Sequence, residues 1–101
     1  MKKSFPLQVP GKDDARVLDA IKFDVRKYVR RERRKTLPEG FDLWRFDCKV
    51  GADAATAEVT PLADLSTAID AVAKTDASVV YLEVLAAPDH RIPGIPAETA
   101  M

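Results

Sequence analysis

The sequence has one cysteine, one histidine and no apolar run that approaches the length of a membrane span. Cys48, being alone, excludes an internal disulfide and is compatible with a reducing compartment. A spanning helix needs about 20 consecutive apolar residues. The stretch at residues 5–9 is too short, and too interrupted by proline, for the apolar core of a signal peptide. We therefore expect a cytoplasmic protein that does not enter a membrane.

Residue types that carry catalysis and metal binding are also scarce. Metal sites need clustered His, Cys or carboxylates, whereas Cys48 and His90 each stand alone in the sequence. Apolar neighbours favour a core thiol over a nucleophilic thiolate at Cys48, and a nucleophile would lack a histidine base in the folded part. Asp13 and Asp14 are better interpreted as helix caps than as a catalytic pair, and residues 10–12 have too few glycines for a phosphate-binding loop. We expect no enzyme activity, no cofactor and no bound metal.

What the sequence does have is charge, and that charge is unevenly distributed. Of the 101 residues, 47% are hydrophobic and 32% are charged, which is typical of one globular domain. The net charge is zero, yet residues 1–50 carry 14 Lys and Arg against 8 Asp and Glu, and residues 51–101 carry 2 against 8. Such asymmetry favours either a polyanion-binding face or two halves that attract each other.

The basic half is dominated by a long amphipathic helix that we predict at residues 13–35. Asp13 is a preferred N-cap, and neither Gly nor Pro follows until Pro38. Glu32 interrupts the apolar stripe of this helix and is a candidate ion-pair partner for Arg45. The apolar residues recur at three- and four-residue steps, which places them on one helical face: Val17, Leu18, Ile21, Val25, Tyr28 and Val29.

The polar face of the same helix carries the candidate binding site. Residues 22–35 hold eight Lys or Arg and only two acidic residues. Phe23 lies among the basic side chains, where its ring could stack on an unpaired base. Part of the pattern is ordinary helix chemistry, because cations near a helix C-terminus suit the macrodipole. The candidate nucleic-acid-binding residues are Lys22, Phe23, Arg26, Lys27, Arg30, Arg31, Arg33, Arg34 and Lys35.

Four strands and a second helix complete the predicted fold. They are an edge strand at residues 2–9, a strand at 41–50, a weaker strand at 55–60, a helix at 62–74 and a central strand at 78–86. Pro6 favours an edge position or a bulge for the first strand, because proline cannot donate to a ladder. Thr60 followed by Pro61 predicts the cap of the second helix.

The order β-α-β-β-α-β predicts an α+β two-layer sandwich of the ferredoxin-like type, with both helices on one face of a four-stranded antiparallel sheet. If the first strand fails to pair, a three-stranded sheet with the same helices remains. We expect one domain at residues 1–87. Residues 88–101 contain three prolines and little apolar surface, which predicts a flexible tail.

Several runs of the sequence resemble a known family. They are Lys3-Ser4-Phe5-Pro6-Leu7, Pro10-Gly11-Lys12, Arg26-Lys27-Tyr28-Val29-Arg30-Arg31-Glu32-Arg33-Arg34-Lys35, Leu37-Pro38-Glu39-Gly40-Phe41 and Phe46-Asp47-Cys48-Lys49-Val50-Gly51-Ala52-Asp53. Together they look like a family of small bacterial proteins labelled as a domain of unknown function, matched to about residue 86. The resemblance implies a bacterial, full-length, single-domain protein. It implies no activity and supplies no catalytic residues.

The sharpest functional hypothesis is sequence-tolerant binding of RNA or DNA through the helix at 13–35, because regularly spaced cations can track phosphates. The strands lack the glycine–aromatic signature of an RNA-recognition motif. One alternative is a basic face that is merely solvated. Another is a protein-interaction or homodimerisation module, in which an acidic partner meets the helix or a second copy covers the sheet face bearing Tyr81 and Leu85.

Overall fold

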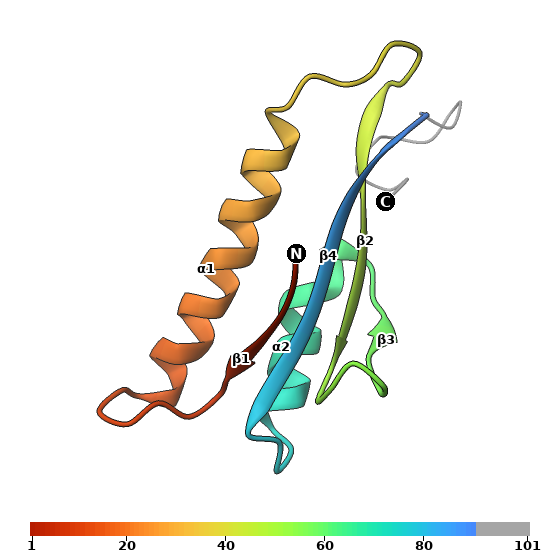
Figure 1. Ribbon diagram of the computed structural model, residues 1–101. Helices are drawn as coiled ribbons and strands as arrows, with labels where there is room; N and C mark the ends of the chain where they lie inside the picture. Colours follow the sequence, from red (N-terminus) through yellow and green to blue (C-terminus); the bar gives the residue numbers. More distant parts are fainter. Residues whose placement is uncertain (91–101) are drawn as a thin grey trace.

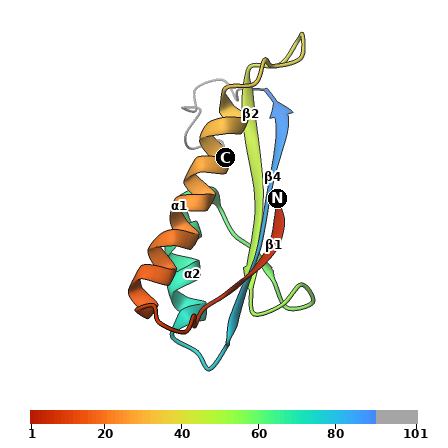
Figure 2. The same ribbon diagram turned by 60° about the vertical axis from the view of Figure 1, so that its left-hand side comes forward.

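The computed structural model describes residues 1–90, and the order of their elements follows the predicted one (Figure 1). The elements are β1 (Lys2–Pro6), α1 (Asp14–Arg33), β2 (Leu43–Gly51), β3 (Glu58–Val59), the 3₁₀ turn η1 (Leu62–Asp64), α2 (Leu65–Ala73) and β4 (Val79–Asp89). Both helices cover the same face of one antiparallel sheet (Figure 2). The α+β two-layer prediction is therefore confirmed.

The strand order differs from the ferredoxin-like arrangement. That arrangement has the first and third strands at its centre, whereas the observed order is β1-β4-β2-β3, with β2 and β4 central. The sequence provides a physical reason: β3 has only two residues, and β1 ends at Pro6. Short or proline-containing strands are tolerated at the edge of a sheet. The predicted edge position of the first strand and the predicted central position of the last are both confirmed.

The core lies between the sheet and the two helices. Val80, Leu82 and Val84 of β4 are completely buried, and Phe46 and Cys48 of β2 are 3% exposed. From the helices, the buried residues are Val17, Ile21, Val25, Val29, Leu65 and Ile69. Burying one such side chain contributes about 1.5–3 kcal/mol, so this shared layer is what holds α1 and α2 on the sheet.

Helix α1 begins and ends close to the predicted boundaries. Asp13 is the N-cap, and its carboxylate accepts the Ala15 N–H at 3.3 Å. At the other end Glu32 contacts Lys35, whose Nζ lies 2.6 Å from Oε2. The suggested pairing of Glu32 with Arg45 is wrong, because the Arg45 guanidinium instead contacts the carboxylates of Asp47 and Asp89, each at 3.0 Å.

The region around β3 departs most from prediction. The Asp53 carboxylate accepts the Thr56 N–H at 2.8 Å and the Thr56 hydroxyl at 2.9 Å, which closes a turn and leaves only Glu58–Val59 to pair with β2. Thr60 is not the helix cap that we predicted. Its hydroxyl donates to the Glu58 carbonyl, and the extended residue Pro61 precedes η1 instead.

The last strand runs further than expected. Leu43 pairs with Asp89, so β4 reaches two residues past the predicted domain boundary at residue 87. The ion pair between Arg45 and Asp89 holds this end of β4 against β2. The remainder of the predicted tail, at residues 91–101, lies outside the described residues.

Candidate functional site

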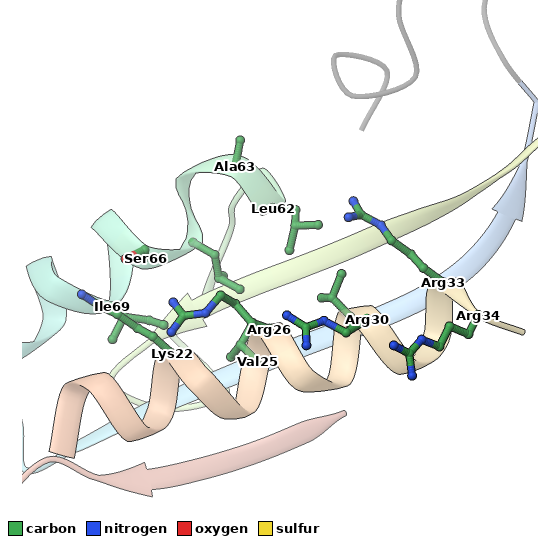
Figure 3. A pocket seen from close by; sticks show the side chains of 12 residues that line it. Lys22, Val25, Arg26, Arg30, Arg33, Arg34, Leu62, Ala63, Ser66 and Ile69 are labelled. Atoms are coloured by element: carbon green, nitrogen blue, oxygen red, sulfur yellow. The ribbon is translucent and has the colours of Figure 1, made fainter. Parts of the chain in front are cut away.

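A groove of about 540 Å³ runs between α1 and the η1–α2 segment (Figure 3). Its floor is apolar and its α1 side is basic. The lining residues are Lys22, Val25, Arg26, Val29, Arg30, Arg33 and Arg34 from α1, and Leu62, Ala63, Leu65, Ser66 and Ile69 from η1 and α2. None of these lining residues is acidic. We call this feature the basic groove.

The basic groove follows from the helical repeat of α1. Val25 and Val29 belong to the buried stripe of the helix. Arg26, Arg30 and Arg33 recur at steps of four and three residues, so their side chains share the edge next to that stripe. Helix α2 has nine residues against twenty in α1. The last turns of α1 therefore extend beyond α2 (Figures 1 and 2).

Two contacts anchor the C-terminal end of α1 to β2. The Trp44 indole N–H donates to the Lys35 carbonyl at 3.0 Å, and the Arg33 guanidinium lies 5.4 Å from the centre of the Phe46 ring. Contacts of this kind restrain the basic end of the helix, because they connect it to a central strand of the sheet.

Ion pairing distinguishes Lys22 from three of the four arginines that line the groove. Lys22 Nζ lies 2.7 Å from Asp70 Oδ1 of α2, and the Lys22 side chain is only 17% exposed. Arg26, Arg30 and Arg34 form no ion pair with any residue in the range 1–90. We call these three arginines the arginine row. Their charge remains available to an external anion.

The structure brings together five of the nine predicted site residues. These are Lys22, Arg26, Arg30, Arg33 and Arg34. The other four lie outside the groove lining, and of these Lys27 is exposed on α1. Phe23 is 57% exposed on α1, and Arg31 lies over the Tyr28 ring with its guanidinium 5.4 Å from the ring centre. Lys35 is paired with Glu32.

Sequence reasoning missed the opposite wall of the groove, which Leu62, Ala63 and Ser66 supply. These residues carry no charge and no motif. A pattern of exposed small residues beside the apolar stripe of the second helix is the available signal. This pattern identifies a groove wall only when α2 is known to pack beside α1.

A second groove, of about 580 Å³, lies at the N-terminal end of α1 and provides a contrast. Its charged lining residues are Lys12, Asp13, Arg16 and Asp24. Two positive and two negative groups balance each other there, so this groove offers no comparable attraction to an anion.

Cys48 is a core residue, as predicted. Its side chain is buried, and its Sγ–H points to the Phe46 carbonyl with a sulfur–oxygen distance of 3.8 Å. Burial raises the pKa of the thiol from 9.0 to about 11, and the nearby Asp47 carboxylate adds to the effect. Within residues 1–90 no group of three or more His, Cys, Asp or Glu side chains could hold a metal ion.

The sheet face opposite the helices mixes apolar and charged side chains. The Tyr81 hydroxyl donates to Glu83 at 2.8 Å, and Glu83 lies between Lys2 and Lys49 of the neighbouring strands. Leu85 is 38% exposed. Nothing in the described range covers this face, and its role in homodimerisation stays a prediction. No helix among residues 1–90 is long and apolar enough to cross a membrane.

Comparison with known proteins identifies a family for this sequence. Neither a curated protein nor a solved structure matches the sequence. Residues 1–94 match the model of a family described as a family of unknown function, DUF6172. The resemblance to a domain of unknown function, drawn from the sequence runs, is thereby confirmed. The chain belongs to the DUF6172 family of unknown function.

Proposed function

We propose that the protein binds nucleic acid, without strong sequence preference, through the basic surface of α1. The observation that carries this proposal is the arginine row, which forms no ion pair within residues 1–90. Its members are spaced four residues apart, which corresponds to about 6 Å along the helix axis. A row of this kind supports contacts to successive phosphates of one strand.

Arginine suits this role better than lysine. Its planar guanidinium donates to two phosphate oxygens at once and is less strongly hydrated than an ammonium group. Phosphate contacts orient a protein on nucleic acid but carry no sequence information. The proposal assigns the arginine row to phosphates and not to base edges, and the basic groove has no Asn, Gln or acidic side chain. The proposed binding is therefore sequence-tolerant.

Attraction between the two halves of the chain accounts for only part of the charge pattern. The Lys22–Asp70 and Arg45–Asp89 pairs each join the basic half to the acidic half. The arginine row takes part in neither pair. Its charge therefore requires either solvent or an external anion, and three aligned guanidinium groups beside an apolar groove favour the anion.

The test reverses the charge of the row. The variant Arg26→Glu, Arg30→Glu, Arg34→Glu should lose binding to a labelled oligonucleotide, measured by fluorescence anisotropy at about 50 mM salt. A matched variant, Lys3→Glu, Lys12→Glu, Lys74→Glu, changes the net charge equally at three exposed positions outside the basic groove. It should retain most of the affinity.

Equal losses in the two triple variants would show that net charge alone governs binding, and would contradict a site on α1. Failure of the wild-type protein to bind any oligonucleotide would remove the proposal altogether.

A further inference from the structure

We infer that the nucleic acid is bound as an unpaired strand, with one base seated in the basic groove between α1 and α2. This inference rests on the function proposed above and names the form of nucleic acid and the additional residues that recognise it. The arginine row by itself could contact the backbone of a duplex or of a single strand. The groove beside it adds a concave, partly apolar site that a stacked and paired base cannot enter.

The dimensions and lining of the groove suit a flat ring. Its volume of about 540 Å³ lies in the range of sites that hold small organic ligands, roughly 300–1,000 Å³. Val25, Val29, Leu65 and Ile69 are each at most 8% exposed, so they close the bottom of the groove. The apolar surface that remains accessible above them comes from Leu62, Ala63 and the aliphatic stems of the arginines. These accessible aliphatic groups can contact one face of a base, whose faces are apolar.

The basic rim supplies partners for the rest of a nucleotide. Unpaired bases stack on the planes of Arg guanidinium groups as well as on aromatic rings. Arg33 extends from the last turn of α1 toward Leu62 on the opposite wall (Figure 3). Arg26 and Arg30 line the same groove and belong to the arginine row. A base in the groove would therefore have guanidinium groups beside it while its phosphates meet the row.

The positive charge of the groove lining favours an anionic nucleotide over an uncharged ligand. The groove lining includes five basic residues and no acidic residue. The second groove, of similar volume, is balanced between basic and acidic residues. An apolar floor combined with a cationic rim complements a ligand that is both planar and anionic, and a nucleotide unit of a single strand has both properties.

The site can be blocked without changing charge. Ser66 is exposed on α2 and lines the groove, so Ser66→Phe places a ring in the space proposed for the base. Ala63→Phe does the same from η1. The neighbouring residue Thr67 is also exposed but does not line the groove, which makes Thr67→Phe the matched control. Circular dichroism of each variant establishes that it is folded.

The measurement compares an unstructured single-stranded oligonucleotide with a duplex of equal length at one salt concentration. Wild-type protein should prefer the single strand by about 5- to 150-fold, the range expected from one stacked base. Both groove variants should lose that preference and retain duplex binding, and the control should behave as wild type. Equal wild-type affinity for the two forms, or an undiminished preference in the folded groove variants, would overturn the inference alone. Absence of binding to either form would overturn the proposed function as well.

Discussion

The burial of Cys48 links a single side chain to the pH dependence of folding. Its thiol has a pKa raised from 9.0 to about 11 in the folded protein, because burial disfavours the thiolate. Between these two values the unfolded chain loses the thiol proton while the folded chain keeps it. The contribution to stability is therefore complete below pH 9 and declines as the pH rises toward 11.

Replacing Cys48 with alanine should flatten this part of the pH profile. From pH 8 to pH 10, the wild-type free energy of unfolding should fall by about 1 kcal/mol more than that of Cys48→Ala. Urea denaturation of both proteins at the two pH values measures the difference. The cavity left by the substitution lowers the stability of the variant at every pH, so only the change with pH is informative. Parallel profiles would contradict the raised pKa.

Single residues also show where sequence reasoning succeeds. Asp13 as a cap and Cys48 as a core thiol were predictable, because each depends on immediate neighbours in the sequence. Thr60 was not. The side chain of a threonine can bond a nearby carbonyl as readily as a helix N–H, and the Glu58 carbonyl receives it here.

Helices α1 and α2 are joined by one ion pair that also affects the proposed site. Lys22 Nζ lies 2.7 Å from Asp70 Oδ1, with the lysine mostly buried and the aspartate 41% exposed. Because Asp70 faces solvent, the pair should stabilise folding only weakly, by about 0.5 kcal/mol. Its larger consequence is to neutralise Lys22, which lines the basic groove.

Removing the aspartate charge should therefore strengthen nucleic-acid binding. Asp70→Asn leaves Lys22 free to contact a phosphate, which should steepen the logarithmic salt dependence of single-strand affinity by about 0.7. Fluorescence anisotropy over a salt series measures that slope. Asp76→Asn, at an exposed position beyond the C-terminal end of α2, makes the same change in net charge away from the groove and should not alter the slope. A weaker affinity in Asp70→Asn would contradict the placement of Lys22 in the site.

The long elements were predictable and their arrangement was not. Apolar residues at steps of three and four identify α1, and alternation identifies β2 and β4, because these periods are set by local geometry. The order β1-β4-β2-β3 depends on which strands pair across long sequence separations. The wall of the groove formed by Leu62 and Ser66 depends in turn on where α2 lies. Five of nine predicted site residues line the groove because they share one edge of α1.

The molecule as a whole is electrically neutral, yet its charge is separated between the two halves of the chain. The central strands β2 and β4 come from opposite halves of the chain, so the two halves alternate in the sheet. The positive charge of the first half is concentrated on α1. A neutral protein is not attracted to nucleic acid by net charge. Electrostatic binding must therefore arise from local charge, and the arginine row places three guanidinium groups without ion pairs along one helix of the described range.

The dependence of single-strand affinity on salt measures that local contact. Fluorescence anisotropy of a labelled oligonucleotide, titrated with wild-type protein at several salt concentrations, gives the slope of log affinity against log salt. With about four phosphates bound by the arginine row and Lys27, the slope should be about −3. A slope near zero, or no binding at about 50 mM salt, would show that the basic surface of α1 does not bind nucleic acid.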